Sequence, residues 1–322
     1  MRLLRSDDVD ALATVEVGLK AARETAELAL RGTMTDGRLQ VGKGDEEAWV
    51  RVLVGIIPDL DVIGYKEFHR VGRRVHYNIS LFRHEGGEPL GIVDGRRITS
   101  LRTASTAALA FQHGFDGAGL GKLAVIGSGE EAREGLRAVA GAVDVGTASI
   151  FSPTPTNREE LARWAREELG IEARPAAGVA EATEGADAAY VATAARAPVV
   201  AAADVTTMRF VGAVGATRPD HHELSGDVFG AAAQVVVDCR DSLEEPGDVI
   251  DAVENFGWDP SPALLLGTWL GQEPAAAGGP VLFKSIGSVE QDLVLALELL
   301  RSGEERGFGE VIEPISSLRV MR

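Results

Sequence analysis

The chain has 322 residues, enough for two domains with separate cores, and its 45% hydrophobic and 25% charged residues are typical of globular proteins. Its 49 acidic and 32 basic residues give a net charge of −17, which argues against nucleic acid and anionic membranes as partners. No apolar run reaches the ~18 residues that span a bilayer, and no signal peptide is recognisable, so we expect a cytoplasmic protein.

The first part of the chain, to about residue 116, predicts an α+β region. Helical spacing of apolar residues predicts a helix over 8–31, in which Gly18 is a point where the helix could break. Strands are expected over 48–54, 61–65, 75–82 and 90–93, and a helix over 99–112.

The middle of the chain changes to a βαβ rhythm, which predicts a doubly wound parallel sheet. Apolar strands are expected over 122–126, 147–151, 171–174, 187–192, 209–214 and 235–239, and helices over 130–142, 157–169 and 220–231. A Gly/Pro-rich stretch at 271–280 precedes a strand at 281–283 and a helix over 289–301. The last twenty residues are expected to return to the first domain.

The most informative motif is the turn Gly127-Ser-Gly129-Glu-Glu-Ala132, which follows a predicted strand and opens a predicted helix. In such a G-x-G-x-x-A turn, the first glycine permits the tight turn and the second lets the backbone approach a pyrophosphate. The small third residue allows close packing, and helix-terminal N–H groups face the phosphates. The turn therefore predicts a dinucleotide site.

Four ordered motifs resemble the ornithine cyclodeaminase/mu-crystallin family. They are Asp94-Gly-Arg-Arg-Ile-Thr-Ser-Leu-Arg102-Thr103-Ala104, the glycine turn, Gly212-Ala-Val-Gly215-Ala-Thr217-Arg218-Pro219-Asp220, and Leu282-Phe-Lys284-Ser285-Ile-Gly287. The first departs slightly from the family pattern, with Ser105 in place of an alanine. The resemblance implies a Rossmann domain, 117–302, inserted in an α+β substrate-binding and dimerisation domain, 1–116 plus about 303–322, and a homodimer.

The resemblance also implies nicotinamide chemistry on amino or imino acids. Arg102 matches the arginine that holds the substrate carboxylate, and a guanidinium suits that task because it binds carboxylates bidentately. Lys66 matches the lysine beside the reacting C–N bond, where an ammonium could orient the carboxylate or transfer a proton. Lys43 is a third candidate cation for the substrate.

Thr217 is the informative departure from the family, since cyclodeaminases and alanine dehydrogenases carry an aspartate at that position. A hydroxyl cannot act as a carboxylate base at neutral pH. Thr217 followed by Arg218 resembles the ketimine reductase branch, in which Thr217 would position substrate or water and Arg218 could contact carboxylate or phosphate. The alternative is that Asp220 or Glu223 replaces the missing aspartate.

The expected cofactor is NADP(H) rather than NAD(H), because no carboxylate follows the second Rossmann strand before Glu159. Ser152, Thr154 and Arg158 could instead accept a 2′-phosphate. The resemblance places further dinucleotide contacts at Thr103, Gly127, Ser128, Gly129, Glu130, Thr193, Gly215, Lys284 and Ser285.

The remaining reactive side chains predict no second chemistry. The six histidines show no metal-ligand spacing, and a single cysteine, Cys239, ends a buried-strand pattern typical of a passive core thiol. We therefore expect an NAD(P)H-dependent imino-acid reductase. An ornithine cyclodeaminase or amino-acid dehydrogenase remains an alternative within the family, and a small-ligand binding protein is the alternative of another class. The substrate side chain is not set by the sequence.

Overall fold

The computed structural model describes residues 1–42, 47–273 and 278–314, which form two compact units. Unit 1 consists of Met1–Arg102 and the segment that begins at Ser288, and unit 2 consists of Thr103–Gly287. These limits differ from the expected ones at 116/117 and 302/303. The observed limit between Arg102 and Thr103 falls inside helix α3 (Arg96–Phe115). The helix is divided there because Ile98 and Leu101 pack in the core of unit 1, while Phe111 packs on Phe210 of unit 2.

Unit 1 is built on a seven-stranded sheet in the order β17-β1-β6-β5-β4-β3-β2. Strands β2 to β6 pair with one another antiparallel, whereas β1 runs parallel to β6 and antiparallel to β17. The bounds are β1 (Arg2–Leu4), β2 (Thr35–Val41), β3 (Ala48–Ile57), β4 (Val62–Val71), β5 (Arg74–Arg83), β6 (Pro89–Asp94) and β17 (Glu310–Val311), with a 3-10 turn at Pro58–Leu60.

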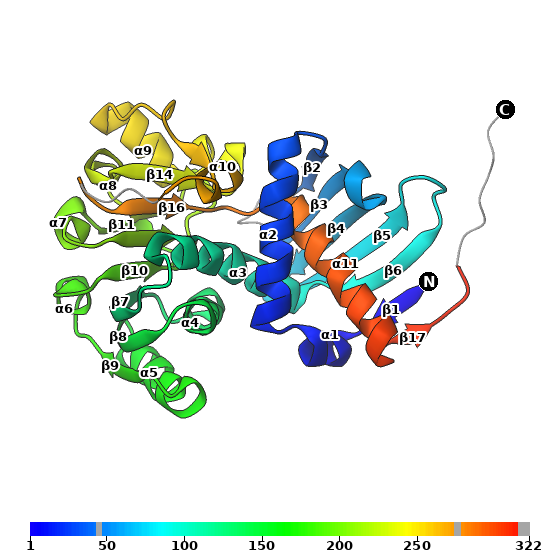
Figure 1. The fold of residues 1–322 in the computed structure, drawn as a ribbon, viewed down its shortest axis with the longest axis horizontal. Coiled ribbons are helices and arrows are strands. Elements are labelled where there is room, and N and C mark those ends of the chain that lie inside the picture. The colour runs from blue at the N-terminus through cyan, green and yellow to red at the C-terminus, as the bar shows by residue number, and fades with distance from the viewer. Residues whose placement is uncertain (43–46, 274–277, 315–322) are drawn as a thin grey trace. The chain divides into compact units, whose positions relative to one another are not determined.

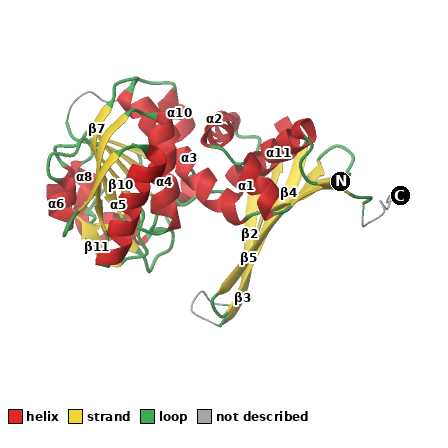
Figure 2. Cartoon of the chain, turned by 90° about the horizontal axis from the view of Figure 1, so that it is seen from below, coloured by secondary structure: helices red, strands yellow, loops and turns green. Residues whose placement is uncertain are grey.

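Three helices, α1 (Ser6–Leu12), α2 (Val15–Arg31) and α11 (Val289–Arg306), lie on one face of this sheet (Figure 2). The single helix expected over 8–31 is therefore wrong: it is divided at Ala13–Thr14, not at Gly18. Thr14 caps α2, because its hydroxyl accepts the N–H of Val17 at 3.3 Å. Gly18 is buried inside α2, and the acceptance of its N–H by the Thr14 carbonyl keeps it helical.

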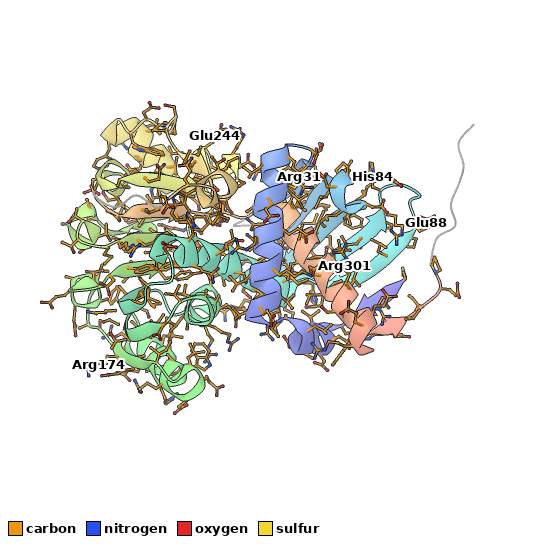
Figure 3. The ribbon with its side chains drawn as sticks, viewed as in Figure 1. Arg31, His84, Glu88, Arg174, Glu244 and Arg301 are labelled. Carbon is orange, nitrogen blue, oxygen red and sulfur yellow. The ribbon has the colours of Figure 1, made fainter. Side chains whose placement is uncertain are left out.

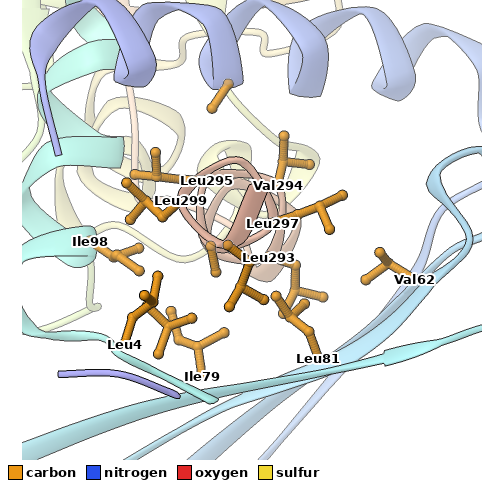
Figure 4. Packing of buried hydrophobic residues seen from close by; sticks show 14 of the residues in the cluster. Leu4, Val62, Ile79, Leu81, Ile98, Leu293, Val294, Leu295, Leu297 and Leu299 are labelled. Carbon is orange, nitrogen blue, oxygen red and sulfur yellow. The ribbon is translucent and has the colours of Figure 1, made fainter. Parts of the chain in front are cut away.

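Helix α11 supplies most of the core of unit 1. Leu293, Leu295, Leu297 and Leu299 surround its axis in Figure 4, with Leu4, Ile79 and Leu81 below them on the sheet. Leu293 packs closely on β3 and β4, because Gly55 and Gly64 face each other across these strands and carry no side chains. A Cβ at Gly64 would lie 2.8 Å from Leu293 Cδ2, so glycine here allows the helix to approach.

Unit 2 is a doubly wound sheet of eight parallel strands (Figure 1), in the order β15-β14-β16-β12-β10-β7-β8-β9. The chain starts at β7, runs outward to β9, and returns to β10 on the other side of β7, so the strand order reverses between β7 and β10. Dinucleotides bind at such a reversal, outside the carboxyl ends of the strands. The strands are β7 (Leu120–Ile126), β8 (Val145–Phe151), β9 (Glu172–Pro175), β10 (Ala188–Val191), β12 (Phe210–Ala213), β14 (Gln234–Val237), β15 (Leu264–Leu265) and β16 (Val281–Lys284).

Helices and a small second sheet complete unit 2 (Figure 1). The helices are α4 (Glu130–Ala142), α5 (Pro155–Leu169), α6 (Val179–Thr183), α7 (Ala202–Val205), α8 (Asp227–Ala231), α9 (Gly247–Phe256) and α10 (Leu266–Leu270), with a 3-10 turn at Arg240–Leu243. Strands β11 (Arg196–Val200) and β13 (His222–Leu224) pair as the second sheet. Charged side chains such as Arg174 and Glu244 project from this unit (Figure 3).

The predicted helix over 220–231 is wrong in its first half. Residues 222–224 form β13, and only Asp227–Ala231 is helical. The backbone N–H of Glu223 is taken by the carboxylate of Asp248 at 2.7 Å, which removes it from any helical ladder. Among the described residues, no helix has the length and apolarity that a membrane span requires.

Candidate active-site residues

The glycine turn has the geometry that a dinucleotide site requires. Gly127 has φ +126°, and a Cβ there would collide with the carbonyl oxygen of Ala192. Gly129 is the N-cap of α4, and a Cβ at that position would meet no atom within 4 Å. Ala132 is fully buried, where the helix packs on the turn. The open space beside the Gly129 backbone at a helix N-terminus fits a pyrophosphate.

Hydroxyl groups gather at the ends of the first two strands of unit 2. Ser128 donates to Ser152 at 2.9 Å between their Oγ atoms, which joins the turn after β7 to the end of β8. Arg158 lies in the first part of α5 and donates from Nη1 to the carbonyl of Ser152 at 2.9 Å. Thr154 is the N-cap of α5. Residues 151–158 include an arginine and no carboxylate, so this corner suits an anionic group.

The loops after β10 and β12 are held together by one buried carboxylate. Glu223 accepts the N–H groups of Thr193 at 2.6 Å, Gly215 at 2.6 Å and Ala216 at 2.7 Å. A Cβ at Gly215 would lie 2.5 Å from both Glu223 Oε1 and Thr193 N, so only glycine fits there. The structure thus brings Thr193 and Gly215 together at the carboxyl edge of the sheet.

Lys284 ends the neighbouring strand β16 and Ser285 follows it, but both side chains point into the protein. The Lys284 ammonium is fully buried, donates to the carbonyl of Ala216 at 2.8 Å and pairs with Asp248 at 2.9 Å. Ser285 is also fully buried and donates to Asp238 at 2.7 Å. Asp238 additionally accepts the N–H of Gly287 at 2.8 Å. These two side chains therefore hold strand-end loops, and only their backbone is left to face a ligand.

Thr217 follows directly after these fixed loops and is half-buried. Arg218 is engaged with its neighbours: its guanidinium lies 3.3 Å from Asp220 and 2.6 Å from the imidazole of His221. Burial and the nearby Arg218 lower the pKa of His221. Asp220 is 50% exposed and also pairs with Arg196.

Neither carboxylate named as a replacement for the missing aspartate is placed as a free base. Glu223 is fully buried and occupied by three backbone N–H groups. Asp220 is exposed and shared between two arginines.

In unit 1, the two predicted substrate cations converge on one carboxylate. Lys66 lies on β4 with its ammonium 2.8 Å from Asp292 of α11, and Arg102 Nε lies 3.5 Å from the same oxygen. Arg102 also donates to the amide oxygen of Gln291 at 3.1 Å. Asp292 is fully buried, Lys66 is 2% exposed and the Arg102 side chain 12%. Charges in so dry a site interact strongly.

Aromatic rings of the same sheet flank Lys66. Its Nζ lies 5.6 Å from the ring centroid of Phe68 and 5.7 Å from that of Tyr77, within the range of cation–π attraction. Lys43, the third predicted cation, falls outside the described residues. Thr103 lies on α3 as the first residue of unit 2 and is 6% exposed, while Glu130 opens α4.

No role is predicted from the sequence for Asp292, Asp248 or Asp238. A signal was present for Asp292, because it interrupts an apolar helix at a position between Val289 and Ala296, on the face that packs on the sheet. Asp248 and Asp238 gave no local signal, since each follows or opens an ordinary element and acts on loops distant in sequence.

Two other features limit the chemistry. Burial raises the pKa of the Cys239 thiol well above its usual value, which fits a passive thiol. No group of three or more His, Cys, Asp or Glu side chains within the described ranges is arranged to hold a metal ion.

A doubly wound sheet with a glycine turn at its first strand places unit 2 in the class of dinucleotide-binding folds, joined here to a unit with a buried cation cluster. The chain belongs to the ornithine cyclodeaminase/mu-crystallin family, whose model matches residues 64–298. The family resemblance and the predicted fold class are thereby confirmed.

Individual relatives match this chain over most of its length. A Delta(1)-pyrroline-2-carboxylate reductase of Bacillus cereus is 27% identical over 310 residues, which cover 92% of this chain and 95% of the relative. The ketimine reductase mu-crystallin of Rattus norvegicus is 29% identical over 220 residues, 68% of this chain and 67% of its own. The Thermococcus litoralis Delta(1)-pyrroline-2-carboxylate reductase structure has a TM-score of 0.88 at 23% identity, covering 97% of this chain and 100% of that one, and shows the same fold.

Proposed function

We propose that this protein is an NAD(P)H-dependent reductase that converts an α-imino acid, such as a cyclic ketimine, to the amino acid. The observation that carries this proposal is the cluster of unit 1. There, two cations, Lys66 and Arg102, share the one carboxylate of Asp292. A substrate carboxylate would find two buried cations side by side here, in a site that excludes water.

Reduction of a C=N bond adds a hydride to carbon and a proton to nitrogen. The dinucleotide, when bound, supplies the hydride from its nicotinamide ring. Arg102 binds the substrate carboxylate, and the Lys66 ammonium orients the substrate and gives its proton to the nitrogen, to be reprotonated from solvent. Thr217 positions substrate or a water molecule by its hydroxyl.

The side chains near Thr217 favour this reaction over cyclodeamination. Release of ammonia and ring closure require a base of the carboxylate class beside the reacting nitrogen, and general-base assistance contributes roughly 10²–10⁴-fold. Glu223 is held by three backbone N–H groups and Asp220 by two arginines. Imine reduction does not need such a base.

We further propose that NADPH is preferred to NADH. The end of β8 offers Ser152 and Thr154, with Arg158 anchored beside them, and residues 151–158 contain no carboxylate to bind a ribose 2′-hydroxyl. A 2′-phosphate would find hydroxyl donors and one guanidinium at this corner.

The uncovered face of the unit 1 sheet supports a homodimer. Lys66 faces α11, so its neighbour Tyr65 and the paired Val54 face the other way, where no helix of the described residues lies (Figure 2). Val54 is 46% exposed, and Leu39 and Val41 on β2 are 62% and 60% exposed. An apolar sheet face of this kind is typical of an interface, and we assign it to a second copy of the chain.

The test is a substrate screen in which NADPH and NADH absorbance is followed with cyclic imino acids, beginning with 1-pyrroline-2-carboxylate. We expect proline to form with NADPH, with a lower kcat/KM for NADH. Equal or better use of NADH would overturn the cofactor preference alone. Absence of turnover with every imino acid, together with tight binding of the same compounds, would instead favour a ligand-binding role.

The same preparation is incubated with L-ornithine and NAD, and proline and ammonia are assayed by chromatography. We expect neither product above background. Stoichiometric formation of proline and ammonia would identify this chain as a cyclodeaminase, in which another group acts as the base in place of the aspartate that Thr217 replaces.

A further inference from the structure

Three charged side chains of unit 2 form a fully buried network apart from the cation cluster of unit 1. Glu223 comes from β13, Asp248 from the first turn of α9, and Lys284 from the end of β16. Lys284 Nζ lies 2.9 Å from Asp248 Oδ2 and 3.9 Å from Glu223 Oε2. Asp248 in turn accepts the backbone N–H of Glu223 at 2.7 Å. We name these three residues the strand-end network.

The partners of the network are backbone groups of the two loops at the carboxyl edge of the sheet. Glu223 takes one N–H from Thr193, after β10, and two from Gly215 and Ala216, after β12. Ala216 is held twice, because its carbonyl also accepts from Lys284 at 2.8 Å. The residue that follows Ala216 is Thr217, so its main chain is fixed up to its own nitrogen.

These loops lie on one side of the strand reversal and the glycine turn on the other. Dinucleotides lie across such a reversal, with one nucleotide on each half of the sheet. The glycine turn and the Ser152–Arg158 corner serve the adenosine half, which leaves the ends of β10 and β12 for the nicotinamide half. A loop whose N–H groups are already bound does not need to reorganise when the ligand arrives.

We infer that the strand-end network is a positioning device, in which Glu223, Asp248 and Lys284 hold the loops after β10 and β12 in the shape that receives the nicotinamide half and presents Thr217. This inference rests on the proposed dinucleotide-dependent function. None of the three side chains touches the reacting atoms; they act through Thr193, Gly215 and Ala216.

The composition of the network fits such a role. Two carboxylates and one ammonium cost less to bury when each oxygen also has hydrogen-bond donors, and Glu223 has three. Burial raises the pKa of Glu223 to about 7, and the Lys284 ammonium opposes that rise. An apolar set of residues would have filled the same space without fixing either loop.

The experiment compares two ligands on Glu223→Gln. An amide offers only one oxygen and would set its own N–H groups against a backbone donor. We expect the Kd for NADPH to rise about tenfold or more, with the Kd for adenosine 2′,5′-bisphosphate, which lacks the nicotinamide half, unchanged within about twofold. In the same variant kcat should fall roughly tenfold to a hundredfold.

The matched control is Asp251→Asn, one turn further along α9. Asp251 also binds a backbone N–H, that of Gly226 at 3.1 Å, yet touches neither strand-end loop. The Asp251→Asn variant should be less stable than the wild type, but the ratio of its Kd values for NADPH and adenosine 2′,5′-bisphosphate should not change. If Glu223→Gln weakens both ligands equally, or neither, the positioning role is overturned.

Two further measurements test whether the strand-end network holds the loops in place. If Glu223→Gln does not fold, Asp248→Asn is the second variant, because it leaves Glu223 in place. It should also raise the Kd for NADPH relative to that for adenosine 2′,5′-bisphosphate, by a smaller factor. In the unmodified protein without dinucleotide, the amides of Thr193, Gly215 and Ala216 should exchange slowly with solvent; rapid exchange would refute a preformed loop. Absence of imine reduction with these binding results intact would overturn the proposed reaction and leave the positioning role standing.

Discussion

In the proposed reaction, removal of Arg102 should separate substrate binding from dinucleotide binding. We predict that Arg102→Ala lowers kcat/KM by a factor equivalent to about 2–5 kcal/mol, because a buried carboxylate of the substrate would lose its partner. The Kd for NADPH should stay within about twofold, since the glycine turn belongs to unit 2. The control is Arg97→Ala on the same helix as Arg102, which removes a surface ion pair with Asp10 of α1. A near-native kcat/KM for Arg102→Ala would remove Arg102 from the site.

Asp292 supports Lys66 in a different way, through charge. In Asp292→Asn the two buried cations would lose the carboxylate oxygen that both now approach, so the Lys66 ammonium would no longer be held in its place. We predict that kcat falls roughly tenfold to a hundredfold, because the proton donor of the imine reduction is displaced. Steady-state rates at saturating NADPH decide this. The control is Glu298→Gln, which removes a carboxylate on the same helix that pairs with Lys20 and Arg301 and should leave kcat unchanged.

Residues were predictable from the sequence where a motif names them, and not where tertiary contacts alone give them a role. A family motif contained Arg102 and the family resemblance pointed to Lys66, and the structure brings both to one carboxylate. Lys284 came from the same motifs, but its ammonium is buried against Asp248, 36 positions away in sequence. A contact of that kind leaves no periodicity for a sequence to reveal.

Helix α11 is the element on which unit 1 depends most. Leu293 is fully buried and occupies the space left by Gly55 and Gly64. We predict that Leu293→Ala destabilises unit 1 by about 2–5 kcal/mol, because the cavity cannot collapse against two strands that are already in contact. Urea unfolding followed by circular dichroism measures the loss. Leu30→Ala, at a 54% exposed position of α2 in the same unit, should change stability by less than about 0.5 kcal/mol.

At the scale of elements, periodicity succeeded where local and tertiary preferences agree. Strand β7, the glycine turn and α4 were all predicted, since apolar run, turn chemistry and helical pattern coincide there. The break after Leu12 was missed because apolar spacing continues across Thr14. Residues 222–224 were missed because the charged pattern around Glu223 resembles an exposed helix, whereas Glu223 is buried with its carboxylate on three N–H groups.

The raised pKa of Glu223 predicts a pH dependence of stability. With a folded pKa of about 7 against the ordinary 4.5, the folded protein binds more protons than the unfolded chain between those values. This group therefore makes the protein less stable as pH rises from about 4.5 to 7, by up to about 3 kcal/mol. Denaturant unfolding at pH 5 and pH 8 of the wild type and Glu223→Gln isolates the contribution. Identical pH dependence in both would contradict it.

On the scale of the whole molecule, the chain leaves unit 1 once and returns once, and both crossings lie beside the cation cluster in sequence. Arg102 is the last residue before unit 2, and Asp292 follows four positions after the return at Ser288. The sequence predicted an insertion but included α11 in the inserted domain. A helix that follows a Rossmann-type strand is expected to pack on that strand's sheet, yet the leucines of α11 pack on β3, β4 and β5 instead.

The uncovered face of the unit 1 sheet predicts that the protein assembles as a dimer. A homodimer would bury Val54, Tyr65 and the β2 residues Leu39 and Val41, which together form an apolar surface in a chain of net charge −17. We predict a dimeric mass by sedimentation equilibrium at micromolar concentration, and a shift toward monomer in Val54→Lys, because a charge buried without a partner opposes association. Glu305→Lys, at an exposed position of α11 on the covered side of the sheet, changes charge in the same unit without touching this surface and should remain dimeric. A monomeric wild type would show that the exposed valines serve another partner, and a Val54→Lys variant that dimerises as tightly as the wild type would place the interface elsewhere.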